Sequence, residues 1–177
     1  GTNISNEDFP NTKSIYQSIY DYVTKFGGNV EFSSDGTYKT KPDHIIMVYG
    51  ETPYAEGEGD IDDLNFSKRN KEILSMMLEF TSKGYPITSL FLSGRPLVVN
   101  DELNMSDAFV SLWLPGTAIE GINDVIFSKK DNSINFDFKG KLSYSWPKTN
   151  SQHSNVGNTN YDPLFAYGYG LTYKDSK

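Results

Sequence analysis

The sequence predicts an α/β fold: a largely parallel sheet sandwiched between helices, with an antiparallel edge strand and a long C-terminal arm. Continuous apolar, β-branched runs, typical of strands covered on both faces, alternate with segments of helical periodicity. An exposed-strand pattern and a tail rich in Asn, Gly and Tyr follow them. The 177 residues, 37% of them hydrophobic, suit one domain with a sizeable core.

The first expected elements are a helix and two strands. Apolar residues recur at helical spacing between residues 15 and 26, and Gly27-Gly28 then ends the helix. A short strand is expected at 30–33. Residues 44–49 form a continuous apolar run with turn residues on both sides, which predicts the first central strand.

The middle of the chain repeats this alternation. Ser67 is expected to cap a second helix, which is apolar along one side and ends at Lys83-Gly84. Residues 87–92 and 108–114 each have the buried-strand pattern and are followed by turn residues, and a further helix is expected at 117–127.

The last part of the chain follows a different pattern. Residues 141–146 alternate like an exposed antiparallel strand, which we expect at the edge of the sheet. The tail at 147–173 has no such periodicity, so we expect a long ordered loop or an arm that wraps around the domain.

Composition and charge exclude several classes of function. The net charge is −7 without a basic cluster, so neither nucleic acid nor an anionic membrane surface is an expected partner. Cysteine is absent, and His44 and His153 are far apart in sequence, which argues against thiolate or His-rich metal sites. No apolar run approaches the ~20 residues of a membrane helix. The first residues lack both Met and the features of a signal peptide, as in a fragment or processed chain.

The loop after the first central strand is the most informative segment. Ligands of open α/β sheets meet the loops at the carboxyl ends of the strands. Here residues 51–63 carry six carboxylates in thirteen positions, and Gly57 and Gly59 give the backbone extra freedom. The charge and the missing Lys exclude a phosphate-binding loop.

Three uses of this acidic loop stay open from the residues alone. It could be a solvated surface loop, a cation site, or the source of a carboxylic acid that donates and accepts protons. The order of its acids does not follow the calcium-loop pattern, which disfavours the cation site.

The next two strand-end loops carry one notable side chain each. Arg95 follows the strand at 87–92, where its guanidinium could clamp a carboxylate of the acidic loop. We favour a structural ion pair over a contact with substrate, because buried arginines need a permanent partner. Trp113 continues an apolar strand and is interpreted as a core residue rather than a platform for a sugar.

Five ordered blocks then resemble one family, glycoside hydrolase family 3, the β-glucosidases and exo-β-glucan glucohydrolases. The first, at 49–60, reads Tyr-Gly-Glu-Thr-Pro-Tyr-Ala-Glu-Gly-Glu-Gly-Asp. The others are Leu-Ser-Gly-Arg-Pro-Leu-Val-Val at 92–99, Asp-Ala-Phe-Val to Trp-Leu-Pro-Gly at 107–116 with Glu-Gly at 120–121, Lys-Gly-Lys-Leu to Trp-Pro at 139–147, and Asn-Val-Gly to Gly-Leu at 155–171. Together the blocks are specific, although each alone is weak.

The resemblance implies that residues 1–177 are a single α/β sandwich domain, without its first strand and without the TIM-barrel domain that precedes it in the family. In that family the barrel carries the aspartate nucleophile. Glu56 is the position that matches the catalytic acid/base. Glu51, Asp60 and Arg95 match motif positions that support the loop, and no substrate-binding residue is assigned.

The implied function is that of part of a retaining, exo-acting β-glucosidase or β-glucan glucohydrolase, and the chain alone is expected to be inactive. The expected partners are a β-glucan or β-glucoside and the TIM-barrel domain, in the same precursor or as a second chain. No cofactor is expected, with structural calcium kept as an alternative, and the expected location is periplasmic or secreted. A non-catalytic module that shapes a glycan cleft is the competing hypothesis, and nucleotide or flavin binding is disfavoured by the absent glycine fingerprint.

Overall fold

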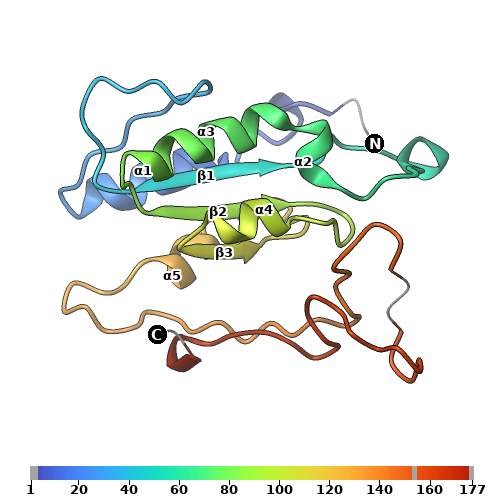
Figure 1. Ribbon diagram of the computed structural model, residues 1–177. Helices are drawn as coiled ribbons and strands as arrows, with labels where there is room; N and C mark the ends of the chain where they lie inside the picture. Colours follow the sequence, from blue (N-terminus) through green and yellow to red (C-terminus); the bar gives the residue numbers. More distant parts are fainter. Residues whose placement is uncertain (1–3, 153–154, 176–177) are drawn as a thin grey trace.

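The computed structural model describes residues 4–152 and 155–175. Within them a parallel sheet is built from β1 (Ile45–Gly50), β2 (Ile87–Leu92) and β3 (Ala108–Ser111), in the order β1-β2-β3 (Figure 1). The register pairs Met47 with Ser89, and Ser89 with Phe109. All three strands therefore end at one edge of the sheet.

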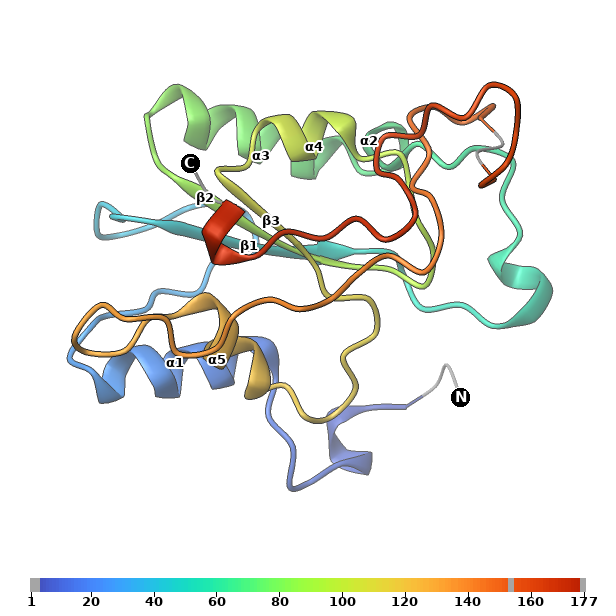
Figure 2. The ribbon, with the colours of Figure 1, turned by 90° about the horizontal axis from the view of Figure 1, so that it is seen from below.

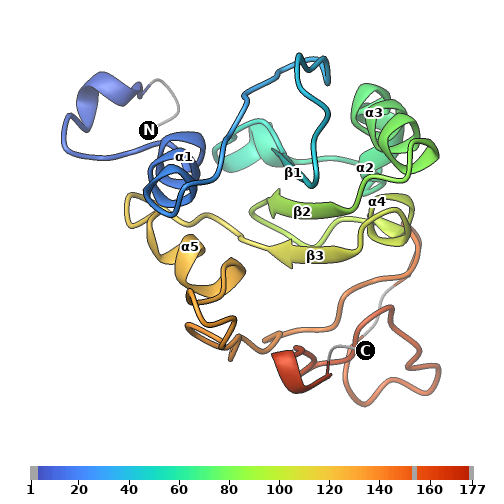
Figure 3. The same cartoon turned by 90° about the vertical axis from the view of Figure 1, so that its left-hand side faces the viewer.

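Helices cover both faces of the sheet. Figure 2 shows α2 (Phe66–Arg69), α3 (Lys71–Ser82) and α4 (Asn100–Asn104) on one side, with α1 (Ile15–Lys25) and α5 (Gly121–Ile126) on the other. Figure 3 shows the same two layers from another side. The fold class predicted from the sequence is confirmed.

Strand periodicity divides the apolar side chains between two cores. Because successive side chains point to opposite faces, Phe91 packs with Phe66 and Met77 on the side of α2 and α3. Its neighbour Leu90 packs with Ile19 of α1 and Ile122 of α5 on the other side. Side chains on both faces of β2 are thus buried, as its sequence pattern predicts.

The helix α1 begins and ends as its sequence indicates. The hydroxyl of Ser14 accepts a hydrogen bond from the backbone N–H of Gln17 at 3.1 Å, and Gly27 follows the helix at φ +86°.

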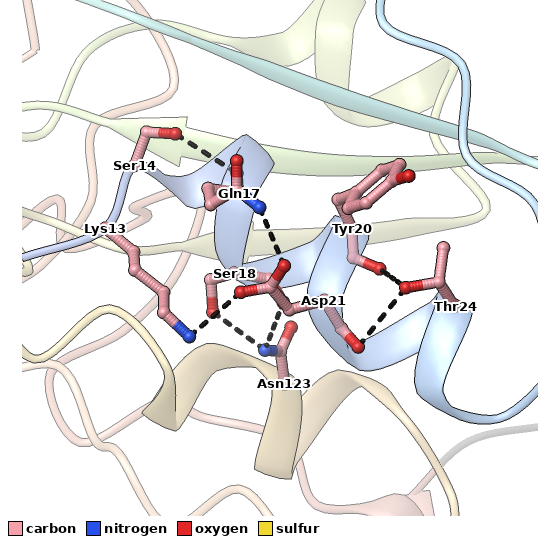
Figure 4. Close-up of polar contacts among 8 residues, drawn as sticks. All are labelled: Lys13, Ser14, Gln17, Ser18, Tyr20, Asp21, Thr24 and Asn123. Carbon is pink, nitrogen blue, oxygen red and sulfur yellow. Dashed lines mark hydrogen bonds and ion pairs between the residues drawn. The ribbon is translucent and has the colours of Figure 1, made fainter.

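A buried polar contact joins α1 to α5: Nδ2 of Asn123 donates to the hydroxyl of Ser18 at 2.8 Å and to its carbonyl at 3.1 Å (Figure 4).

Two expectations about local structure were wrong. Ser67 does not cap the second helix but lies inside α2, which is capped by the side chain of Asn65. Residues 30–33 are not a strand, because the carboxylate of Glu31 accepts the backbone N–H groups of Lys39 and Thr40 and closes a local loop instead.

The expected antiparallel edge strand is also absent from the sheet as described. Residues 141–146 form a single antiparallel bridge, Trp146 to Phe165, in the described part of the chain. The backbone N–H of Leu142 donates to the carbonyl of Tyr169 at 2.8 Å. The segment therefore pairs with the C-terminal arm, and the two run side by side in Figure 1.

The ends of two other elements fall short of their expected ranges. The strand expected at 108–114 stops at Ser111, and Trp113 takes a positive φ of 56°, which no strand allows. The helix expected at 117–127 is α5, which starts only at Gly121. The 3₁₀ turns η1 (Asn6–Asp8) and η3 (Tyr173–Asp175) lie near the two ends.

Candidate active site

The acidic loop and the Arg95 loop start side by side at the carboxyl edge of the sheet. Gly50 pairs with Leu92 at the end of the two strands, and the backbone N–H of Glu51 donates to the carbonyl of Leu92 at 3.0 Å. A Cβ at Gly50 would lie 1.9 Å from that carbonyl oxygen, so this approach requires glycine.

Arg95 fastens the acidic loop at three points. Its Nε lies 3.0 Å from Oε1 and 3.3 Å from Oε2 of Glu51, and its Nη1 donates to the carbonyl of Gly59 at 2.6 Å. The guanidinium carbon lies 4.3 Å from the centre of the Tyr54 ring, within cation–π range. The side chains of Arg95 and Glu51 are 21% and 9% exposed, so the ion pair is largely shielded from water. The ion pair expected from the sequence is therefore present.

Tyr54 fills the space between this clamp and two glycines. A Cβ at Gly59 would lie 2.3 Å from Cδ2 of Tyr54, and a Cβ at Gly94 would lie 2.7 Å from its hydroxyl oxygen. Gly59 is buried and Tyr54 half-buried. The ring thus packs against the backbone of both loops.

Glu56 lies at the exposed tip of the loop. It begins the 3₁₀ turn η2 (Glu56–Gly59), where the backbone N–H of Asp60 donates to the carbonyl of Gly57 at 3.1 Å. Glu56 has φ +47°, a left-handed conformation that costs a non-glycine residue of order 1 kcal/mol. Such outliers occur preferentially at functional sites. Asp60 is exposed where the turn ends.

The remaining acids of the loop are spread apart. Asp63 pairs with Lys68 at 2.7 Å. The side-chain amide of Asn150, from the C-terminal arm, donates to the carbonyl of Asp62 at 3.1 Å and accepts the backbone N–H of Leu64. In the described residues, no three His, Asp or Glu side chains are grouped so that they could hold a metal ion. The expectation of no cofactor stays a prediction.

Trp113 packs against aromatic residues of the C-terminal part of the chain. Its ring centre lies 5.5 Å from that of Trp146 and 5.7 Å from that of Tyr144. Trp146 is itself buried, and its Nε1 donates to the carbonyl of Leu97 at 2.7 Å. These contacts agree with the interpretation of Trp113 as a packing residue.

A shallow apolar depression adjoins the same edge. Its volume is about 350 Å³. Leu114 lines it and is 75% exposed. The other lining residues are Lys13, Ser14, Ile15, Leu92, Pro115, Gly116 and Ile119.

Sequence reasoning missed two residues of this region. Tyr54 stands in the motif at 49–60, and its position between Glu51 and Gly59 is the sequence signal that could have singled it out. Asn150 is far from the acidic loop in sequence and lies in a segment without periodicity, so no local pattern pointed to it.

The histidines lie away from this edge or outside the described residues. His44 precedes β1 at the opposite end of the strands, where its Nε2 lies 2.8 Å from the hydroxyl of Thr88 and burial lowers its pKa. His153 is among the residues that the structure does not describe. None of the helices in the described ranges has the length and apolar character needed to cross a membrane.

Fold and loops together define an α/β sandwich domain with an acidic, clamped loop at the carboxyl edge of its parallel sheet. Residues 1–173 match the Glycosyl hydrolase family 3 C-terminal domain, and the chain therefore belongs to that family. The family resemblance found in the sequence motifs is confirmed.

Known relatives carry names from the same group of enzymes. The chain is 49% identical to an exo-1,3/1,4-β-glucanase (ExoP) from a Pseudoalteromonas species, with a TM-score of 0.94 over 99% of this chain and 22% of that one. A lysosomal β-glucosidase of Dictyostelium discoideum is 29% identical over 74% of this chain and 16% of its own length. A periplasmic β-glucosidase of Salmonella typhimurium is 26% identical over 74% of this chain and 19% of its own length. This chain thus spans about a fifth of the length of these relatives.

Proposed function

We propose that this chain supplies the general acid/base, Glu56, to the active site of a retaining, exo-acting β-glucosidase or β-glucan glucohydrolase. One observation carries the proposal. Glu56 is exposed, with a strained backbone, on a turn fastened by Arg95 at the carboxyl edge of the sheet. A carboxyl group in that position can reach a ligand bound outside the domain.

The other acids of the loop are poorer candidates. The carboxylate of Glu51 is 9% exposed and paired with Arg95, and that of Asp63 is paired with Lys68. Glu58 lies in the same turn as Glu56 and is exposed. It is the natural control for any experiment on Glu56.

The chemistry follows from two carboxyl groups acting on one glycosidic bond. Protonated Glu56 donates its proton to the leaving glycosidic oxygen while an aspartate outside this chain attacks the anomeric carbon. Deprotonated Glu56 then takes a proton from water, and the hydroxide oxygen displaces the aspartate from the sugar. A retaining mechanism requires about 5 Å between the two carboxyl groups.

The nucleophile must come from a partner domain, for which a TIM barrel is the proposal. The small share of each relative that this chain spans supports a larger enzyme. The apolar depression with exposed Leu114 supports a partner that covers the edge next to Glu56. We expect no turnover of an aryl β-glucoside by the 177-residue chain alone, since one carboxylate cannot perform double displacement.

The test is Glu56→Ala in the full-length enzyme, with Glu58→Ala as the matched control. Glu56→Ala should lower turnover of a β-glucan about 10²–10⁴-fold, the usual contribution of general acid/base catalysis, and Glu58→Ala should change it little. With 2,4-dinitrophenyl β-glucoside, whose leaving group departs without a proton, azide should attack the glycosyl-enzyme, raise turnover in Glu56→Ala only and yield a β-glycosyl azide. Unchanged hydrolysis by Glu56→Ala would favour the non-catalytic, cleft-shaping module instead.

The names of the relatives support two further proposals, on the sugar that the enzyme prefers and on its location. Other relatives are named β-xylosidases, from Formosa agariphila and Xylanibacter ruminicola, at 26% and 29% identity. We propose glucose at the non-reducing end, to be tested by comparing aryl β-glucoside with aryl β-xyloside. We also propose a periplasmic or secreted location, for which the Salmonella relative's name is the support.

A further inference from the structure

The turn that carries Glu56 is closed at its base by one aromatic ring. Tyr54 lies two residues before Glu56, and its ring occupies the position that a Cβ at Gly59 would need. We propose that Tyr54 is the positioning residue for Glu56: its ring fixes the direction in which the carboxyl group points. This inference rests on the proposed function of Glu56.

The contacts of the ring join both ends of the turn. Tyr54 precedes the exposed span 55–58, and Gly59 ends it. The ring touches Gly59 and also lies under the guanidinium of Arg95, whose Nη1 holds the carbonyl of Gly59 at 2.6 Å. The ring of Tyr54 and the guanidinium of Arg95 therefore hold the two ends of the turn together, while the four residues at 55–58 between them are exposed.

The span itself has little else to hold it. The backbone N–H of Glu58 donates to the carbonyl of Ala55 at 3.2 Å, and that of Asp60 to the carbonyl of Gly57 at 3.1 Å. A Cβ at Gly57 would meet nothing within 4 Å. The left-handed backbone of Glu56 must thus be maintained by the base of the turn.

Glycine is required at the two contact positions for a steric reason. Any side chain at Gly59 would displace the ring, since its Cβ would lie 2.3 Å from Cδ2 of Tyr54. Gly94, in the neighbouring loop, would place a Cβ 2.7 Å from the hydroxyl oxygen of Tyr54. The ring consequently lies in a slot formed by both loops.

The rate of proton transfer depends on where the carboxyl group of Glu56 lies. A general acid must come within about 2.6–3.2 Å of the oxygen it protonates, and a displacement of 1 Å can cost about 10²-fold in rate. The need for the proton depends on the leaving group: a sugar alkoxide requires it, whereas dinitrophenolate leaves without it. A positioning defect therefore appears as a loss that depends on the leaving group.

The experiment compares kcat/KM of the full-length enzyme for laminaribiose and for 2,4-dinitrophenyl β-glucoside, because kcat/KM reports the bond-breaking step. Tyr54→Ala should lower the value for laminaribiose about 10–100-fold and should leave that for the dinitrophenyl substrate nearly unchanged, because its leaving group needs no proton. Tyr54→Phe keeps the ring and should restore the ratio of the two values to that of the parent enzyme.

A second substitution approaches the same contact from the other side. Gly59→Ala should reproduce the leaving-group dependence, and combining it with Tyr54→Ala should add little, because the two changes disrupt one contact. Equal losses on both substrates in Tyr54→Ala, or additive losses in the double variant, would overturn the positioning role.

Glu56→Gln in the same assay separates this inference from the function on which it rests. If Glu56→Gln itself shows no dependence on the leaving group, the acid/base proposal fails. If Glu56→Gln shows the dependence and Tyr54→Ala does not, only the role of Tyr54 is wrong.

Discussion

Nε of Arg95 lies 3.0 Å from Oε1 of Glu51. Glu51 is the first residue after β1, and Arg95 lies in the loop that follows the neighbouring strand β2, so this ion pair joins the two loops. The same guanidinium donates to the carbonyl of Gly59, at the far end of the acidic loop. One side chain thus fixes both the start and the end of the segment that carries Glu56.

Removal of this guanidinium should destabilise the domain. Arg95→Ala leaves the carboxylate of Glu51 largely buried and unpaired, which in buried pairs costs about 3–5 kcal/mol; the partial exposure of Arg95 favours the lower end. Calorimetry of the full-length enzyme should show a lower Tm. Arg95→Ala combined with Glu51→Gln removes the orphaned charge and should recover part of the loss; no recovery would contradict a shielded ion pair.

The contact between α1 and α5 offers a smaller, cleaner test. Asn123→Ala removes the donor to both the hydroxyl and the carbonyl of Ser18 in a buried setting, so we expect a loss of about 1–3 kcal/mol. Ser18→Ala leaves the carbonyl acceptor in place and should cost less. Denaturant unfolding of both variants measures the difference, and equal losses would argue that the carbonyl contact contributes nothing.

A buried carboxyl should make stability depend on pH. The side chain of Glu102 is fully buried in α4. Burial raises the pKa of Glu102 above its ordinary value near 4.5, although hydrogen bonds from its own backbone N–H and from the hydroxyl of Ser67 oppose the shift. The folded state therefore keeps this proton at pH values where the unfolded state has lost it.

The sign of the effect follows from that difference. The contribution of Glu102 to stability is most favourable below the ordinary pKa and falls as the pH rises through the raised pKa. Glu102→Gln mimics the neutral acid and should gain stability over the parent enzyme progressively above pH 4.5. Tm measured from about pH 4 to about pH 8 checks this, and a constant difference between the two proteins would count against a buried, neutral Glu102.

The buried strands were the predictable part of this fold. Residues 87–92 form a largely buried, uncharged run because both faces of β2 are covered, and the strand was predicted to the residue. Residues 30–33 alternate apolar and polar side chains but pair with no strand among the described residues, and the carboxylate of Glu31 accepts backbone N–H groups nearby. Whether a segment becomes a strand depends on whether another strand lies beside it, and the local sequence does not specify that neighbour.

The site was predictable in its chemistry more than in its packing. The acids of the loop and Arg95 could be picked out from the sequence because they are charged residues that directly follow buried strands. The fit of Tyr54 against Gly59 depends on a turn geometry that no periodicity reveals. The support from Asn150 depends on where an irregular arm happens to lie.

The last prediction concerns the surface that should meet the partner domain. Leu114 is 75% exposed beside the apolar depression at the edge that also carries Glu56. Burying such a side chain contributes about 1.5–3 kcal/mol, so Leu114→Asp should lower Tm and activity of the full-length enzyme if the partner covers this edge. The loss should be similar for substrates with good and poor leaving groups, since the whole active site is then misassembled.

The control for this surface is a leucine of comparable exposure on the other helix layer. Leu78 of α3 is 52% exposed, and Leu78→Asp should leave activity nearly unchanged. If both variants behave alike, or if Leu114→Asp is as active as the parent, the partner does not dock at the depression. A selective effect of Leu114→Asp would instead tie the apolar depression to the same assembly that brings the nucleophile within reach of Glu56.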